Sequence, residues 1–288
     1  MASIKNRILV PVDFSDQSLI ALEQSFNLAR LTDAEIFIMH TIDEAFHLPL
    51  IGAKEDKQME KKVQKALEKL ADETSQKSGA KVDVVVAKGK IYEEIQKVAK
   101  KLKCTLIIMG TNGSKGLKRF IGSNALRVIR EAPCPVITIK GKKHRSGCKD
   151  IVLPLDLQKE TKEKVTKAIE LAQLFGSTIH LLTILDTEDD FIVKKLTRQM
   201  NQVNDFVNEH NVPCLQEFVK GDDISEEVVK YSKKVKADLI MIMTQQEMDW
   251  TDMFISPAAQ NIINHSDIPV LSIRPKERKN TMTSVYQY

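Results

Sequence analysis

The apolar residues of this chain fall into short runs that alternate with longer amphipathic stretches. In the first half, five runs are typical of buried strands: Ile8–Val12, Ile36–Thr41, Val82–Val86, Thr105–Met109 and Val136–Ile139. The segments between them have helical spacing, with Ser15 as the cap of the first helix, Gly79 as the end of the second, and further helices over Ile91–Leu102 and Ser123–Arg130. Strands that alternate with helices predict βαβ units, and therefore a parallel sheet covered by helices on both faces.

The pattern occurs twice. The segment Ile8–Phe14 recurs as Ile151–Leu157, 143 positions later, and Pro135–Lys140 recurs as Pro269–Arg274, 134 positions later. Self-similarity of this kind indicates a tandem duplication. We predict a first domain at 1–142, a basic linker around 141–147, a second domain at 148–276 and a polar tail at 277–288.

Composition narrows the class of protein. The chain has 288 residues, 42% hydrophobic and 28% charged, and no apolar run approaches the roughly 18 residues of a membrane helix. The first residues run directly into a strand, which predicts no signal peptide. Four cysteines without metal-ligand spacing predict reduced thiols in a cytoplasmic protein. The net charge of +4 is spread along the chain. It does not require a nucleic-acid partner and gives weak support for an anionic ligand, so we expect no nucleic-acid partner.

The candidate chemistry lies in the stretch Ile107–Ile129, which contains Gly110, Gly113 and Gly116 and then Gly122-Ser123 before a helix. Phosphate oxygens need backbone N–H groups at close range, which glycine permits, and a helix start favours anions. Ser123 and Asn124 add a hydroxyl and an amide, and three basic residues lie in the loop. The pattern is neither a Walker A loop nor a G-x-G-x-x-G fingerprint. On spacing alone, a phosphate site and a plain glycine-rich turn with a solvated basic face both remain open.

A second feature points to the same edge of the sheet. Ligands of parallel sheets bind beyond the carboxyl ends of the strands, where the strand order reverses. Pro11-Val12-Asp13 closes the first strand, and Gly110 follows the fourth. If these strands are neighbours, the two segments face each other across one crevice. There Asp13 could accept hydrogen bonds from ribose hydroxyls or help hold a metal ion.

Together these motifs resemble the universal stress protein family: PVDFS after the first strand, MGTNG after the fourth, a later GS, and CPVITIK at the end. The resemblance covers nearly the whole chain. It implies an α/β fold of two tandem Rossmann-like domains, similar to adenine nucleotide alpha hydrolases. Each domain has a five-stranded parallel sheet of order 3-2-1-4-5.

The resemblance also implies a ligand, because family members with the motif G-x2-G-x9-G-(S/T) bind ATP. Here the spacer, Ser114 to Ile121, has eight residues instead of nine. ATP, with Mg²⁺ as a candidate companion, is the implied cofactor. The implied nucleotide-contacting residues are Pro11, Val12, Asp13, Thr41, Met109, Gly110, Gly113, Ser114, Gly122, Ser123 and Asn124.

The second copy lacks this glycine set. A gap-free alignment at 134 positions places Thr244 at Gly110, Glu247 at Gly113 and Ser256-Pro257 at Gly122-Ser123. The same alignment replaces two lysines of the loop by aspartates, Asp249 and Asp252, so we expect no nucleotide in the second domain.

The last strand of each copy leaves an open edge, and the family dimerises through it. We therefore expect Pro135–Ile139 to pair with Pro269–Ile273, which makes the chain a covalent pseudo-dimer. A homodimer of two chains remains open.

No catalytic constellation is evident, and we interpret His40 as a structural histidine. The leading hypothesis is a cytoplasmic stress protein that binds ATP in its first domain and acts as a nucleotide-dependent sensor or regulator, with at most slow ATP hydrolysis. A nucleotide-free interaction scaffold is the main alternative. A hydrolase or nucleotidyl-transfer enzyme on a related fold is the third.

Overall fold

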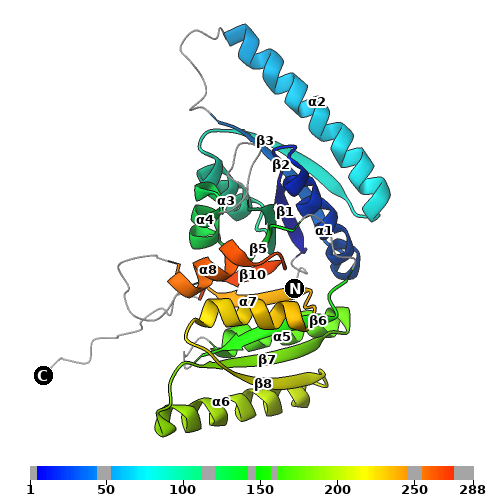
Figure 1. Cartoon of the computed structure of the whole chain (residues 1–288). Helices are drawn as coiled ribbons and strands as arrows, with labels where there is room; N and C mark the ends of the chain where they lie inside the picture. Colours follow the sequence, from blue (N-terminus) through cyan, green and yellow to red (C-terminus); the bar gives the residue numbers. More distant parts are fainter. Residues whose placement is uncertain are drawn as a thin grey trace, which may run out of the picture.

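One ten-stranded sheet runs through both halves of the chain, with helices packed on its two faces (Figure 1). The computed structural model describes residues 5–43, 53–111, 121–141, 147–156, 161–244 and 255–275.

The first half alternates strands and helices as the sequence predicts. Its elements are β1 (Arg7–Pro11), α1 (Asp16–Thr32), β2 (Glu35–Ile42), α2 (Ala53–Ser78), β3 (Val82–Lys88), α3 (Ile91–Lys101), β4 (Leu106–Gly110), α4 (Ser123–Glu131) and β5 (Val136–Ile139). Ser15 caps α1 as predicted, and its side chain accepts a hydrogen bond from the Ser18 N–H. Gly79 follows α2 with a left-handed φ of 70°, a conformation that glycine adopts without steric cost.

The second half repeats this order. Its elements are β6 (Asp150–Leu155), α5 (Thr161–Phe175), β7 (Thr178–Leu185), α6 (Asp190–Glu209), β8 (Cys214–Lys220), α7 (Ile224–Lys234), β9 (Leu239–Met243), α8 (Pro257–His265) and β10 (Val270–Ile273).

The strand order is β3-β2-β1-β4-β5-β10-β9-β6-β7-β8, so each half has the predicted order 3-2-1-4-5. Strands pair in parallel within each half, and β5 and β10 pair antiparallel where the halves meet. In that pair Ile137 lies opposite Leu271, its own equivalent in the second copy. A pseudo-twofold axis therefore passes through this pair, which confirms the predicted pseudo-dimer.

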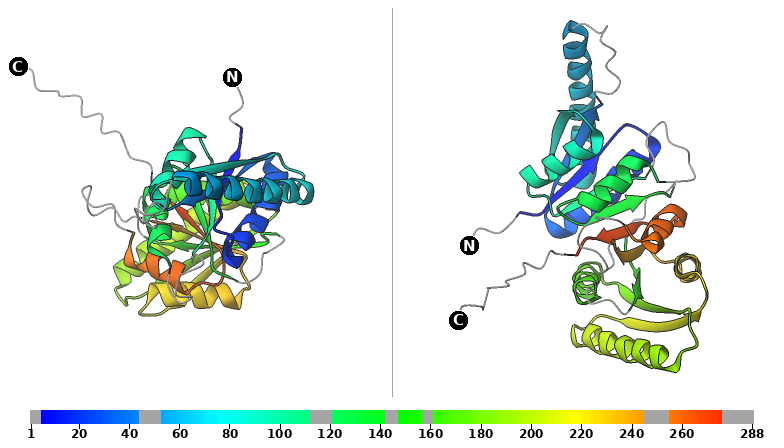
Figure 2. Two further views of the ribbon diagram at one scale, coloured as in Figure 1. Left: turned by 90° about the horizontal axis from the view of Figure 1, so that it is seen from above. Right: turned by 90° about the vertical axis from the view of Figure 1, so that its left-hand side faces the viewer.

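Alternate side chains of the strands face two apolar cores. Ile8 and Val10 of β1 point to the core under α1, α2, α5 and α6, whereas Leu9 points to the core under α3, α4, α7 and α8. Each core contains residues of both halves, so the two halves share both cores. Figure 2 shows the halves from two further directions, with α2 at one end of the sheet and α6 at the other. Burial on both faces explains why the strands are continuous apolar runs.

The hydrogen-bond register corrects the gap-free alignment of the two copies. Ile139 of β5 and Ile273 of β10 are equivalent residues, 134 positions apart. Ile139 pairs with Gly110 of β4, and Ile273 pairs with Met243 of β9. Gly110 is therefore equivalent to Met243, and Thr244 is equivalent to Thr111. The Gly122 N–H donates to the Thr111 carbonyl at 2.8 Å, just as the Ser256 N–H donates to the Thr244 carbonyl at 3.0 Å. The second copy thus has one additional residue in the connection between these points, and the glycine of β4 is still replaced.

Candidate functional site

The carboxyl ends of β1 and β4 lie side by side, because Ile8 pairs with Leu106 and Leu9 with Ile107. β1 is followed by α1 and β4 by the connection to α4, so the chain turns away from the sheet in opposite directions at this point. This is the topological switch point of the first half. The predicted crevice between the end of β1 and Gly110 is therefore at the place where this fold binds ligands.

The end of β1 is held by the neighbouring strand. The Val12 N–H donates to the Met39 carbonyl at 2.7 Å, and His40 Nδ1 lies 2.7 Å from the Val12 carbonyl. Since a carbonyl accepts, His40 must carry its proton on Nδ1 in this bond. His40 thus stabilises the backbone at the crevice, which supports its interpretation as a structural histidine.

Asp13 lies at the start of α1 and is half-buried. Its Oδ1 accepts hydrogen bonds from the Ser15 N–H at 3.1 Å and from Ser15 Oγ at 2.5 Å. The Asp13 N–H donates to Ser18 Oγ at 3.3 Å. These contacts fix the carboxylate beside the crevice with part of its acceptor capacity already used by the helix cap.

Phe14 is a feature of this site that the sequence did not reveal. Its φ of 61° lies in the left-handed region, and its side chain is 41% exposed. A bulky residue rarely adopts this conformation, and strain of this kind clusters at ligand sites. The ring lies 5.5 Å from that of His40. The turn therefore leaves a large apolar side chain in solvent directly after Asp13.

Gly110 ends β4 against the first turn of α1. A Cβ at this position would lie 3.2 Å from both the carbonyl carbon and the Cβ of Gln17, closer than a packed interior accepts without adjustment. From the sequence, we interpret Gly110 as a glycine that lets a ligand approach the backbone. The structure shows a second reason for glycine here, because α1 packs closely against this residue. Gln17 is itself held by its side chain, which donates to the Lys140 carbonyl at 2.8 Å.

The start of α4 differs from that of α8. Gly122 is the N-cap of α4 and has no side chain to accept from the first N–H groups, and no acidic residue lies in the first turn. In α8, the N-cap Ser256 accepts from the Ala259 N–H at 3.2 Å, and Pro257 removes one N–H. Within the described residues, the start of α4 therefore has no side-chain cap, whereas that of α8 is capped by Ser256.

The remaining predicted residues group around the same edge. Met109 is buried in β4, and Thr41 is half-buried near the end of β2, one strand beyond β1. Ser123 is exposed and Asn124 half-buried in the first turn of α4. Gly113 and Ser114 lie outside the described residues. The structure therefore brings the ends of β1 and β4 and the start of α4 to one edge of the sheet.

The second half touches this site directly. The Ile121 N–H, adjacent to the N-cap of α4, donates to Asn264 Oδ1 of α8 at 3.0 Å. The Asn264 carbonyl accepts a hydrogen bond from Lys140 Nζ, and the Asn264 side chain is buried. Gly141 approaches the Asp267 carbonyl so closely that a Cβ would lie 2.8 Å from it. The position of the α4 start therefore depends on the packing of the two halves.

The described residues offer little for thiol or metal chemistry. Within them, no group of three His, Cys, Asp or Glu side chains could hold a metal ion. All four cysteines are free. Burial raises the pKa of the Cys134 thiol to about 12, and that of Cys104 and Cys214 to about 11. Thiols of this kind are poor nucleophiles at neutral pH.

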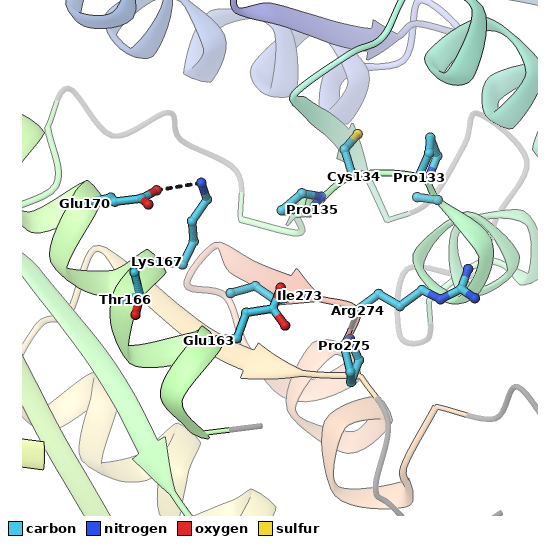
Figure 3. A pocket seen from close by; sticks show the side chains of 11 residues that line it. Pro133, Cys134, Pro135, Glu163, Thr166, Lys167, Glu170, Ile273, Arg274 and Pro275 are labelled. Carbon is cyan, nitrogen blue, oxygen red and sulfur yellow. Dashed lines mark hydrogen bonds and ion pairs between the residues drawn. The ribbon is translucent and has the colours of Figure 1, made fainter. Parts of the chain in front are cut away.

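Two cavities lie away from the predicted residues. One, of about 630 Å³, lies between the halves beside α5, the start of β5 and the end of β10. Figure 3 shows its lining, in which Lys167 pairs with Glu170 at 2.6 Å and Cys134 and Arg274 stand on the opposite side. The other, of about 260 Å³, lies in the second half beyond the ends of β6 and β9. Its location is equivalent to that of the crevice in the first half.

The described helices include none that is both long enough and apolar enough to span a bilayer.

Comparison with known proteins gives the family. The model of the Universal stress protein family matches residues 5–140 and 147–274. Universal stress protein MJ0531 of Methanocaldococcus jannaschii is 35% identical over 146 residues, which cover 49% of this chain and 85% of that protein. The crystal structure of a universal stress protein from Archaeoglobus fulgidus DSM 4304 covers 93% of this chain and 96% of that chain, with a TM-score of 0.76 and 18% identity.

A further structure is that of the universal stress protein from Archaeoglobus fulgidus in complex with dAMP. It covers 43% of this chain and 97% of that chain, with a TM-score of 0.38 and 15% identity. The two family matches and the identity to MJ0531 establish that this chain belongs to the universal stress protein family, with two of its domains in tandem.

Proposed function

We propose that this protein binds one molecule of ATP, in its first domain, and acts as a nucleotide-dependent regulator in the response to stress. The site is the crevice between Pro11–Asp13 at the end of β1, Gly110 at the end of β4, and Gly122–Asn124 at the start of α4.

The observation that carries this proposal is the contrast between the two helix starts. In the first domain, the N-cap of α4 is Gly122, which has no side chain to accept from the first N–H groups of the helix. Gly110, at the end of β4, lies at the same edge of the sheet. In the second domain, the equivalent positions hold Ser256, Pro257 and Met243, and Ser256 caps the helix itself. A polyphosphate needs uncommitted N–H groups at a positive helix end. The uncapped start of α4 in the described residues therefore supports a site in the first domain.

The other residues fit the remaining parts of a nucleotide. Asp13 is a hydrogen-bond acceptor of the kind that recognises ribose hydroxyls. Thr41, near the end of β2, is the proposed neighbour of the adenine ring. Asn124 adds an amide at the start of α4. The proposed fit thus rests on one acceptor, one neighbour of the base and one set of N–H donors.

Regulation follows from the link between the site and the second domain. Asn264 of α8 binds the Ile121 N–H next to the N-cap of α4, and β5 is continuous with β10. A ligand that fixes the start of α4 therefore acts on the surface where the domains meet. This link makes the second domain a candidate reporter of nucleotide binding.

Isothermal titration calorimetry with ATP and Mg²⁺ tests the proposal. Gly122→Val should remove binding, because its Cβ would already lie 3.3 Å from the Thr111 carbonyl and the larger side chain blocks the helix start. Gly147→Val is the matched control, since a Cβ there has no atom within 4 Å. Absence of heat with wild-type protein that has been freed of copurified nucleotide would favour the nucleotide-free scaffold. Binding that survives in Gly122→Val would place the nucleotide elsewhere.

A further inference from the structure

The second domain has a buried lysine where the first has an alanine. Lys164 of α5 is equivalent to Ala21 of α1, since β6 and β7 keep the same shift of 143 positions from β1 and β2. Ala21 is fully buried, and Lys164 is 3% exposed. A buried ammonium is costly unless it is paired or a ligand uses it. The substitution therefore calls for an explanation at this position.

The amine reaches the end of β6. Lys164 Nζ donates a hydrogen bond to the Pro154 carbonyl at 2.5 Å. Pro154 is equivalent to Pro11, so the amine lies where the first domain has the backbone of its predicted crevice. A neutral amine that donates one N–H to this carbonyl keeps its lone pair available for another group.

Lys164 also lines the cavity of about 260 Å³ in the second domain. Most of the wall is aliphatic, with contributions from β7, β9 and three helices, and includes Leu182, Ile184, Ile192, Leu196, Ile242 and Ile262. Pockets for drug-sized ligands are about 300–1,000 Å³. A cavity of this size and composition suits a small ligand with an aliphatic body.

The charges around the cavity select against an anion. Asp156 and Asp186 line it with exposed carboxylates, and the start of α8 is already capped by Ser256. Burial lowers the pKa of Lys164, and the Asp156 carboxylate opposes this effect in part. The amine is therefore uncharged in a larger fraction of molecules than an exposed lysine is. A desolvated amine of this kind is a nucleophile toward carbonyl groups.

We propose that the crevice of the second domain is a separate small-molecule site, in which Lys164 captures a short aliphatic aldehyde as an imine. Nζ forms a bond to the carbonyl carbon, the two amine protons and the carbonyl oxygen leave as water, and a C=N bond remains. The aliphatic wall holds the alkyl chain, and the Pro154 carbonyl fixes the direction of Nζ before the imine forms. No oxidant, metal or nucleotide takes part in this step.

The wild-type protein tests this directly. It is incubated at pH 7 with hexanal and sodium cyanoborohydride, which reduces the imine to a stable secondary amine, and the labelled lysines are located by tandem mass spectrometry. Lys162, exposed on the same helix, is the internal control. Because burial lowers the pKa of Lys164 and the aliphatic wall holds the alkyl chain beside its amine, we expect Lys164 to be labelled faster than Lys162. Equal or slower labelling of Lys164 would overturn the proposal.

Three further measurements define the ligand. Glyceraldehyde, which is polar, should show little preference for Lys164, and an equal preference would refute recognition by the aliphatic wall. Ile192→Asn should reduce labelling by hexanal several-fold, because Ile192 is a partly exposed part of that wall. In Gly122→Val, in which the first-domain site is blocked, saturating ATP should leave the labelling rate unchanged. Protection by ATP in that variant would instead identify the cavity as a nucleotide site and overturn the assignment.

Discussion

Replacement of Asn264 should weaken both the domain interface and the nucleotide site. In Asn264→Leu, the Ile121 N–H loses its acceptor at 3.0 Å in a buried position. A buried donor without a partner costs about 1–3 kcal/mol. We therefore expect the free energy of unfolding to fall by that amount. The hydrogen bond from Lys140 to the backbone carbonyl of residue 264 does not depend on the side chain and is retained.

The same change should reduce affinity for ATP. Ile121 precedes the N-cap of α4, so a freed N–H allows this turn to adopt arrangements that do not present the helix start. If restoring the helix start in the variant takes about 1.4 kcal/mol of the free energy of ATP binding, the Kd for ATP rises about tenfold. Urea denaturation measures the first effect and calorimetry with ATP and Mg²⁺ the second.

Two controls separate the causes. Asn264→Asp keeps an oxygen acceptor for the Ile121 N–H and should retain more stability than Asn264→Leu. Asn261→Leu changes an exposed residue of the same helix and should leave both quantities within about 0.5 kcal/mol of the wild type. Reduced stability with unchanged affinity in Asn264→Leu would refute the coupling between the domains. Unchanged stability would refute the energetic role of the hydrogen bond.

Two other predictions concern the fold. Hydrogen bonds from Lys5 and Arg7 lower the pKa of Glu35 to about 2 from its ordinary 4.5, so its stabilising contribution is present above pH 4.5 and is lost as the pH falls toward 2. Because Lys5 and Lys81 are exposed, we expect Glu35 to contribute only roughly 1–2 kcal/mol to the free energy of unfolding. The difference in unfolding free energy between the wild type and Glu35→Gln should therefore shrink as the pH falls from 4.5 toward 2. A difference that stays constant over this range would contradict the prediction. Leu271→Ala, at the pseudo-twofold axis, should cost about 2–5 kcal/mol in urea denaturation, and a loss below 1 kcal/mol would show that the β5–β10 junction is not a packed core.

The periodicity of the sequence predicted the fold well because burial imposes it. Val136–Ile139 has the predicted bounds, while β4 begins at Leu106 and ends at Gly110, one residue later than predicted. The difference at the start concerns Thr105. Its N–H donates a hydrogen bond to the Arg7 carbonyl, but the residue pairing of β4 with β1 begins only at Leu106. Hydrophobic patterns locate a strand, but hydrogen bonds decide its ends.

The site was predicted less completely. The alignment of the copies was wrong by one residue at Gly110, because the sequence of a polar loop gives no physical marker for an insertion, whereas strand register does. The left-handed conformation of Phe14 has no sequence signal, since phenylalanine rarely adopts it. Lys164 reads as an ordinary lysine of a charged helix, and only the packing of α5 on β6 reveals its burial. Properties that depend on tertiary contacts were thus beyond the sequence pattern.

The nucleotide content of the purified protein tests the central claim most directly. The protein is purified without added nucleotide, denatured, and the released small molecules are identified and quantified by mass spectrometry against the protein concentration. We predict one adenine nucleotide per chain, and its loss in Gly122→Val with retention in Gly147→Val. Two nucleotides per chain would contradict the assignment to the first domain alone, and none would favour the nucleotide-free scaffold.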